Sequence, residues 1–361
     1  MLLSVIIPTR NRAGRLADLL DSLAGQEPAP FDWEVIVVDN ASTDSTADVA
    51  QEKSQALPLA LRHVLEPQLG LHHGRHRGAK EARGEYLGYL DDDMILAPSW
   101  LQGVELLVRG EAEAVVGRIL PKWEAELPDW LPLLWREHPQ GTVLGQLSLL
   151  DLGESPKPVG PEYVFGCNCF MIKKTLFDLG GFHPDGMPLH LLRWRGDGET
   201  GMMKKFKGRG LRSYYDPRAT AFHIVDAGRL TLEYFCQRAY NQGISDSFTK
   251  IRADQGLAPP VPGKSLPPDP AGGSLSRKNL WERFEELSLT DRARALVGRA
   301  RLLLRGLGKE AAPATAPGPP PEILVRMAEA HRAGWQFHQD EARRDPDLLK
   351  YILQPTYLAD L

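Results

Sequence analysis

The sequence has few cysteines, no strong excess of either charge and no long hydrophobic run. Its 361 residues include only Cys167, Cys169 and Cys236, an odd number without the spacing of a metal-binding motif. This count argues against a disulfide framework and predicts a reducing compartment. The 43 basic and 47 acidic side chains give a formal charge of -4. We therefore expect no nucleic-acid partner, since such proteins usually carry a strong basic excess.

No segment has the pattern of a signal peptide or a membrane span. The first apolar segment, residues 2–7, follows Met1 directly, lacks a basic start and ends at Pro8. No stretch approaches the ~18 apolar residues that a membrane-spanning helix needs. We therefore expect a cytoplasmic protein, with peripheral contact at the inner face of a membrane left open.

The glycine-rich loops of the two commonest nucleotide-binding folds are also missing. The first apolar segment is followed by PTRNRAG, which does not match G-x-G-x-x-G, and no Walker motif occurs. These absences argue against a Rossmann-type dehydrogenase and a P-loop nucleotidase.

The N-terminal part alternates short apolar strands with helices. Residues 3–7 and 34–38 are β-branched apolar runs, typical of strands buried on both faces. Between them, residues 15–24 place four leucines on one helical face. Residues 42–44 have the chemistry of a helix start, and residues 86–90 form a third apolar strand. This alternation predicts an α/β fold with a mainly parallel sheet and ligands at the carboxyl ends of its strands.

The C-terminal part has a different composition. Residues 256–273 and 311–321 are rich in proline and glycine, as in linkers or ordered surface loops. The segments 278–309 and 322–353 are helical by pattern. Within the first, residues 290–309 are basic and amphipathic. A packed helix with a solvated arginine face is favoured there, and contact with an anionic membrane is the alternative.

Acidic side chains follow two of the predicted strands. Asp91, Asp92 and Asp93 come directly after residues 86–90, and their mutual repulsion must be offset by a cation or by hydrogen-bond donors. Such oxygen ligands suit Mg²⁺ or Mn²⁺, which also bind a diphosphate. The alternative is a solvated acidic turn. Asp39 ends the preceding strand, where it can accept hydrogen bonds from a ribose or a base, or cap the following turn.

Three segments carry a family resemblance in their order and spacing: SVIIPTRNR, VVDNASTD and GRHRGAKEARGEYLGYLDDDMILAPSWL. Together they cover residues 3–100 and resemble the N-terminal half of family 2 glycosyltransferases of the GT-A fold. The resemblance implies a mostly parallel central sheet flanked by helices, with a helical C-terminal extension here. It also implies that Asp91 and Asp93 bind Mn²⁺ or Mg²⁺. The residues that it places near the nucleotide donor are Pro8, Thr9, Arg10, Asp39, Arg75, Asp91 and Asp92.

Three histidines depart from the family pattern. His76 stands where the family usually has asparagine, and His72 and His73 are also unusual. Contact with the donor stays open for all three, and surface positions are the default expectation.

The second half is similar to the acceptor side of the same family. In RGDGETGMMKKF, alignment with the family pattern places Glu199 on the acid that deprotonates the acceptor, with Gly198 in place of the preceding acid. A shift of register would give this role to Asp197 instead. The resemblance also supports His223 as a third metal ligand, although a structural role for this histidine is equally open.

The resemblance implies a metal-dependent, inverting transfer of a sugar from a nucleotide-diphosphate donor, with UDP-sugars favoured. The acceptor is a carbohydrate or a lipid-linked molecule, as in polysaccharide, glycolipid or glycoconjugate synthesis. Two alternatives stay open: a non-catalytic nucleotide- or sugar-binding protein, and a sugar nucleotidyltransferase. We expect a GT-A domain at residues 1–226, with a nucleotide-sugar half at 1–100 and an acceptor half at 101–226. A mainly helical region follows at 227–361.

Overall fold

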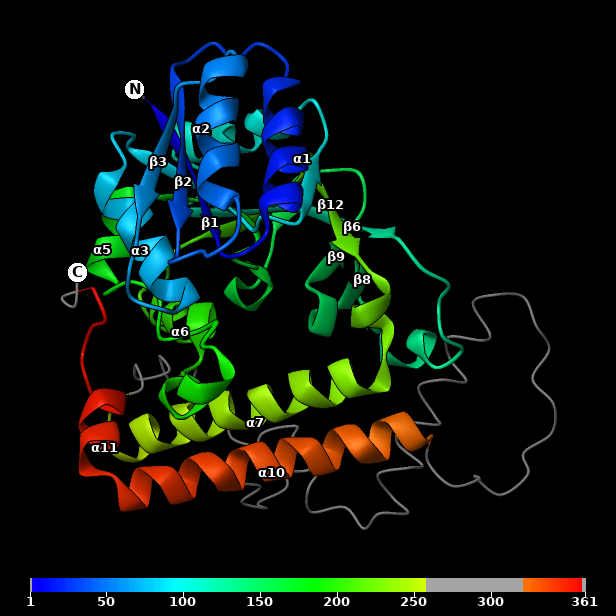
Figure 1. The fold of residues 1–361 in the computed structure, drawn as a ribbon, viewed down its shortest axis with the longest axis vertical. Helices are drawn as coiled ribbons and strands as arrows, with labels where there is room; N and C mark the ends of the chain where they lie inside the picture. Colours follow the sequence, from blue (N-terminus) through cyan, green and yellow to red (C-terminus); the bar gives the residue numbers. More distant parts are fainter. Residues whose placement is uncertain (1, 258–320, 359–361) are drawn as a thin grey trace, which may run out of the picture.

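The computed structural model describes residues 2–257 and 321–358 (Figure 1). The predicted amphipathic helix at 290–309, the rest of segment 278–309 and nearly all of both predicted linkers lie outside these residues. No helix in the described ranges is both long and apolar enough to span a bilayer.

The first part alternates strands with helices, as expected from the sequence. In chain order the elements are β1 (Leu3–Thr9), α1 (Ala13–Ala24), β2 (Trp33–Asp39), α2 (Thr46–Ala56), β3 (Leu61–Leu65), α3 (Leu71–Glu81), β4 (Tyr86–Leu90) and β5 (Met94–Leu96). The start of α2 corrects one prediction. Residues 42–44 precede the helix, and Asp44 instead accepts hydrogen bonds from the backbone N–H groups of Ala13 and Thr46.

The rest of the sheet comes from the middle of the chain, which also contributes short helices. The elements are η1 (Trp100–Val104), α4 (Glu105–Val108), β6 (Ala114–Trp123), η2 (Leu131–Leu134), β7 (Arg136–His138), β8 (Gly141–Leu144), η3 (Gly145–Leu147), β9 (Leu149–Asp151), β10 (Lys157–Pro158), η4 (Pro161–Tyr163), β11 (Asn168–Ile172), α5 (Lys173–Asp178), η5 (Leu189–Trp194), α6 (Gly198–Gly208), β12 (Ser213–Val225) and η6 (Ala227–Leu230).

These strands form one sheet in the order β3-β2-β1-β4-β11-β6-β9-β8-β7, with β12 pairing β6, β5 and β10. The four strands from β3 to β4 are mutually parallel, and β12 runs parallel to β6. The centre of the sheet is therefore mostly parallel, which confirms the predicted α/β class. Because β1, β2 and β4 end at the same edge, the residues after them are brought together there.

Two glycines allow α3 to lie very close to the sheet. A Cβ atom at Gly74 would stand 2.9 Å from Pro8 Cβ, and one at Gly78 would stand 2.3 Å from Ile6 Cγ2. Only glycine fits at such a separation. Arg75 follows Gly74, so this close packing fixes the position of Arg75 relative to the ends of the strands.

Two long helices, α7 (Leu232–Asp254) and α10 (Glu322–Arg344), lie side by side beneath the α/β part, and α11 (Pro346–Ile352) follows (Figure 1). α7 and α10 run in the same direction. They approach closely at Gly334, where a Cβ would lie 2.0 Å from the carbonyl oxygen of Tyr240. The prediction that residues 322–353 are helical is confirmed.

Candidate active site

The acidic turn lies between β4 and β5, and two of its aspartates are buried. Asp92 and Asp93 are 6% and 4% exposed. The hydroxyl of Thr9, at the end of β1, donates a 2.7 Å hydrogen bond to Asp92 Oδ2. Arg12 Nη1 lies 3.0 Å from Asp92 Oδ1 and 2.7 Å from Asp93 Oδ2. The turn is therefore not a solvated one: donors from the loop after β1 offset its charge.

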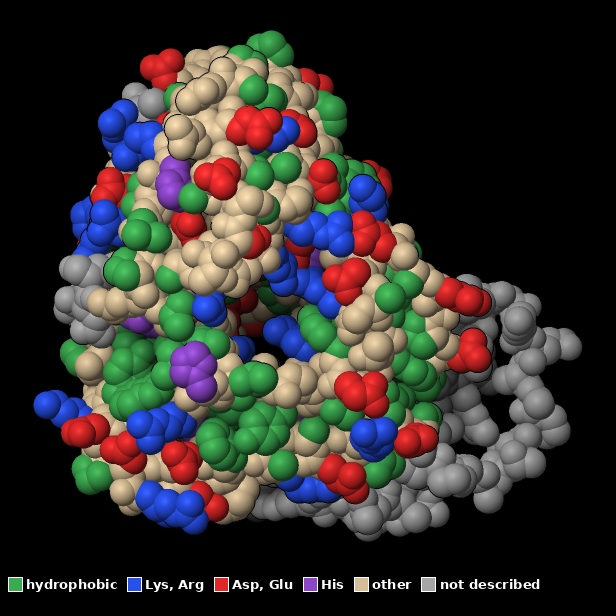
Figure 2. Space-filling model, in the orientation of Figure 1, with side chains coloured by type: hydrophobic (Ala, Val, Ile, Leu, Met, Phe, Trp, Pro, Cys, Tyr) green, Lys and Arg blue, Asp and Glu red, His purple; other side chains and the backbone are tan. Residues whose placement is uncertain are grey.

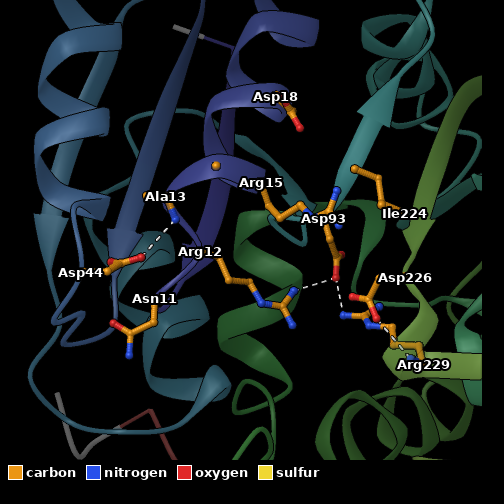
Figure 3. A pocket seen from close by; sticks show the side chains of 11 residues that line it. Asn11, Arg12, Ala13, Arg15, Asp18, Asp44, Asp93, Ile224, Asp226 and Arg229 are labelled. Atoms are coloured by element: carbon orange, nitrogen blue, oxygen red, sulfur yellow. Dashed lines mark hydrogen bonds and ion pairs between the residues drawn. The ribbon is translucent and has the colours of Figure 1, made fainter. Parts of the chain in front are cut away.

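His223 reaches Asp93 because β12 pairs with β5. His223 is opposite Met94 in this pairing, which places it beside the preceding residue, Asp93. His223 Nε2 lies 3.4 Å from Asp93 Oδ1, and Arg229 Nη2 lies 2.5 Å from Asp93 Oδ2. Figure 3 shows Arg12 and Arg229 directed at Asp93 from two sides. His223 lies within β12, two residues before the strand ends at Val225.

The two buried carboxylates differ in the direction in which their pKa is shifted. Burial raises the pKa of Asp92 above its usual range, with the charge of Asp93 adding to the rise and Arg12 opposing it. Burial by itself also raises the pKa of Asp93, but the positive charges of Arg229 and Arg12 hold it well below its usual range. Asp93 is thus the firmly ionised member of the pair.

Arg75 joins the acidic turn to α6. Its side chain is 4% exposed, with Nη2 3.2 Å from Asp91 Oδ1 and Nη1 3.4 Å from Glu199 Oε2. The side chains of Asp91 and Glu199 are 33% and 28% exposed, so both face solvent on one side. Glu199 lies in the first turn of α6. One guanidinium therefore holds two part-exposed carboxylates from different elements.

Asp197 has a different environment from Glu199. It occupies the position before α6 but makes no cap hydrogen bond, and its side chain is 5% exposed. Asp197 Oδ1 is 2.6 Å from His183 Nδ1, and Thr249 of α7 donates a 2.6 Å hydrogen bond to Oδ2. Burial alone would raise the pKa of Asp197, but chiefly His183 lowers it to about 2. Both carboxylate oxygens are occupied inside the protein.

The remaining residues of the predicted nucleotide site lie around the ends of β1 and β2. Asp39 is 3% exposed; its Oδ1 accepts a 2.8 Å hydrogen bond from the N–H of Ser42, and its Oδ2 lies 3.5 Å from His63 Nε2. Pro8 is buried in β1 under Gly74, whereas Arg10 is exposed in the following loop. The predicted residues thus surround one strand edge, with Pro8 supporting α3.

A cavity of about 630 Å³ opens beside Asp93. Figure 2 shows a hollow in the surface between the α/β part and the two long helices, with acidic and basic side chains around it. The cavity lies between the start of α1 and the ends of β12 and η6. It is lined by Asn11, Arg12, Ala13, Gly14, Arg15, Asp18, Asp44, Asp93, Ile224, Asp226 and Arg229.

Sequence reasoning missed two arginines and misplaced three histidines. Arg12 and Arg229 were not singled out, because a single arginine outside a regular pattern carries no periodic or spacing signal. His72, His73 and His76 are buried, not on the surface. His76 Nε2 accepts a 2.8 Å hydrogen bond from the N–H of Phe182, and burial lowers the pKa of His76 to about 3. These histidines pack α3 against the segment around Phe182.

The predicted metal ligands are brought together only in part. Within residues 2–257 and 321–358, no three His, Cys, Asp or Glu side chains gather around one point, and Asp91 is turned to Arg75. Asp93 Oδ1, however, is buried and accepts no hydrogen bond, and it faces His223 Nε2. A cation held by these two side chains, with phosphate oxygens completing its shell, fits this arrangement.

Comparison with known proteins matches the N-terminal part of the chain to one family. A model of the family described as glycosyl transferase family 2 matches residues 4–174. Validoxylamine A glucosyltransferase of Streptomyces hygroscopicus subsp. limoneus is 38% identical over 117 residues, which are 32% of this chain and 25% of that protein. The glycosyltransferase AglE of Haloferax volcanii is 31% identical over 114 residues, 32% of this chain and 38% of that protein. The chain thus spans well under half the length of these relatives.

Among solved structures, the mannosyltransferase PcManGT from Pyrobaculum calidifontis, in complex with GDP-Man and Mn²⁺, has a TM-score of 0.52. It is 20% identical, and the match covers 99% of this chain and 84% of that one. At this identity the likeness concerns the fold alone. The GT-A fold predicted from the sequence, with its helical C-terminal region, is confirmed.

Proposed function

Residues 4–174 are a glycosyl transferase family 2 domain, and from this premise we propose that the chain transfers a sugar from a nucleotide-diphosphate donor to an acceptor hydroxyl. The observation that carries the proposal is the bridge made by Arg75. It ties Asp91 of the acidic turn to Glu199 of α6, at 3.2 and 3.4 Å. A donor site and a part-exposed carboxylate are thereby held next to one another, as bond transfer requires.

We assign the donor to the edge formed by β1, β2 and β4. Thr9 and Asp39 lie at the ends of β1 and β2, where a nucleoside meets buried hydrogen-bonding groups, and Arg10 is exposed beside them. Asp92 is fixed by Thr9 and Arg12, so it is already oriented toward this edge. UDP-sugars are the favoured donors, with GDP-sugars the competing class to be tested.

A divalent cation, Mn²⁺ or Mg²⁺, belongs between Asp93 and His223 in this proposal. When bound, it supplies a Lewis acid that neutralises the departing diphosphate. The chain's own part is to keep Asp93 ionised and to aim His223 Nε2 at it. Asp91, whose side chain is 33% exposed, is the second acidic side chain that we assign to this metal site.

We assign Glu199 as the general base and Asp197 as its support. Glu199 is part-exposed toward Arg75, so it can take the proton of an acceptor hydroxyl that attacks the anomeric carbon. Attack from the face opposite the diphosphate, with no protein nucleophile, inverts the anomeric centre. Asp197 is buried, with one oxygen engaged by His183 and the other by Thr249, so it is not presented to a substrate. The acceptor is a carbohydrate or a lipid-linked molecule.

The test compares Glu199→Gln with Asp197→Asn in a donor-hydrolysis assay with Mn²⁺ and a panel of UDP- and GDP-sugars. Water then serves as acceptor, so the true acceptor is not needed. We expect Glu199→Gln to lower kcat by about 10²- to 10⁴-fold, with nucleotide binding and unfolding unchanged. Asp197→Asn should chiefly lower stability, because it weakens a buried hydrogen-bonded pair.

Three outcomes decide between the candidate functions. Undiminished turnover by Glu199→Gln shows that the base is elsewhere. A wild-type protein that binds UDP or GDP but cleaves no donor is a non-catalytic binding protein. Release of pyrophosphate from a nucleoside triphosphate and a sugar phosphate identifies a nucleotidyltransferase.

A further inference from the structure

Arg229 contacts both side chains that face the cation position. Nη2 lies 2.5 Å from Asp93 Oδ2, and Nη1 lies 2.6 Å from His223 Nε2. The side chain is only 16% exposed, so these contacts are shielded from water. Arg229 belongs to η6, which follows β12 after Asp226. Two nitrogens of one guanidinium thus cover a carboxylate and an imidazole that point at each other.

The hydrogen bonds of His223 fix which ring nitrogen carries the proton. His223 Nδ1 lies 2.7 Å from the carbonyl oxygen of Leu147, which can only accept, so Nδ1 carries the hydrogen. Arg229 can only donate, so His223 Nε2 offers its lone pair to the guanidinium. A metal-binding histidine has this same form, with the second nitrogen held by a carbonyl. His223 is therefore prepared for a cation, and Arg229 occupies the lone pair that a cation would take.

We propose that Arg229 takes the place of the divalent cation in the ligand-free protein. Its guanidinium neutralises Asp93 and is displaced when the metal–nucleotide complex binds. The inference deepens the proposed function and rests on it. In the ligand-free protein, Arg229 offsets the buried charge of Asp93 together with Arg12. A metal that takes His223 Nε2 and Asp93 must displace the guanidinium, since both cannot use the same lone pair.

The released side chain has a place to go while its backbone stays fixed. The N–H of Arg229 donates to Asp226, whose side chain caps η6, and this anchor does not depend on the guanidinium. The cavity beside Asp93 is lined by Arg229 and Arg12. In that cavity the freed positive charge faces the phosphates that arrive with the metal. Metal and nucleotide should therefore bind with positive coupling, each weakly alone.

The test measures Mn²⁺ binding, by calorimetry and by the electron paramagnetic resonance signal of free Mn²⁺, to the full chain without nucleotide. We expect Arg229→Ala to bind Mn²⁺ about 10-fold more tightly than wild type, in the range usual for coupled sites. Arg229→Lys keeps the charge but replaces the two-nitrogen fork of the guanidinium with a single ammonium, so its Mn²⁺ affinity should fall between those of wild type and Arg229→Ala. Arg15→Ala is the control: Arg15 lines the same cavity but pairs with Glu124, and its loss should change Mn²⁺ affinity by less than about 2-fold.

The direction in which Arg229→Ala changes the Mn²⁺ affinity distinguishes a displaced arginine from one that only positions the metal ligands. If Arg229 merely holds His223 and Asp93 in place, Arg229→Ala will bind Mn²⁺ more weakly, and equal affinity likewise overturns the inference. The same titrations with UDP and GDP present should show that the coupling seen in wild type is lost in Arg229→Ala. If wild type binds Mn²⁺ in the presence of a nucleotide but Arg229→Ala does not bind Mn²⁺ more tightly than wild type, only the displacement of Arg229 is refuted. The proposed function then stands. Absence of Mn²⁺ binding by wild type and variants, even with nucleotides, removes the metal from the proposed function as well.

Discussion

Replacing Arg75 with methionine tests the bridge on which the proposed site depends. Methionine keeps an unbranched apolar stem beside Phe182, whose ring centre lies 5.1 Å from the guanidinium carbon of Arg75. The change removes the charge that Asp91 and Glu199 share. It leaves the close packing of α3 intact, because that packing depends on Gly74 and Gly78.

The magnitude follows from the burial of the three groups. Removing one partner of a fully buried ion pair costs about 3–5 kcal/mol. Here the guanidinium is 4% exposed, but the carboxylates are 33% and 28% exposed, so water relieves part of their repulsion. We therefore expect Arg75→Met to lower the free energy of unfolding by about 2–3 kcal/mol. Donor turnover should fall by about 10- to 100-fold, because Glu199 loses its orienting contact.

Urea denaturation and donor hydrolysis measure the two effects. Arg77→Met is the matched control on the same helix: its side chain is 40% exposed and pairs with Glu81 at i,i+4, so its loss should cost less than about 0.5 kcal/mol. If Arg75→Met is as stable as Arg77→Met and turns over donor like wild type, Arg75 does not organise the site. A variant that loses stability but keeps full turnover would show that the bridge is structural only.

Three further predictions concern α6 and the helical layer. Gly198 has φ +54°, and a Cβ there would lie 2.7 Å from Asp185 Oδ2, so Gly198→Ala should lower the free energy of unfolding by about 1–2 kcal/mol in urea denaturation. Gly334→Ala would force α7 and α10 apart at Tyr240 and should cost about 2–3 kcal/mol in the same measurement, whereas an unchanged midpoint would contradict the close contact. The pKa of Asp197 is lowered from 3.8 to about 2, so its ionised form stabilises the fold above about pH 4, and this part is lost as pH falls toward 2. It amounts to about 2 kcal/mol, and wild type should lose that much more stability than Asp197→Asn between pH 7 and pH 2 in denaturant titrations; equal losses would refute the assignment.

Local signals in the sequence were sufficient for the N-terminal fold. The apolar runs at residues 3–7, 34–38 and 86–90 correspond to β1, β2 and β4 because strands buried on both faces need continuous apolar side chains. The acidic turn after β4 was also visible, since three adjacent carboxylates stand out in any context. The start of α2 was not visible in the sequence. The side chain of Asp44 accepts a hydrogen bond from the backbone N–H of Ala13, a residue distant in the sequence.

The sequence by itself determined the strand–helix alternation, the placing of Thr9, Asp39 and the acidic turn at strand ends, and the helical pattern of residues 322–353. Tertiary structure alone decided which charges meet. The pairing of β12 with β5 brings His223 to Asp93, and the close approach of α3 brings Arg75 to Glu199. Such contacts join residues more than a hundred positions apart, so no local pattern encodes them. Burial of the α3 histidines and of Asp197 likewise depends on what packs over them, a property of the assembled fold.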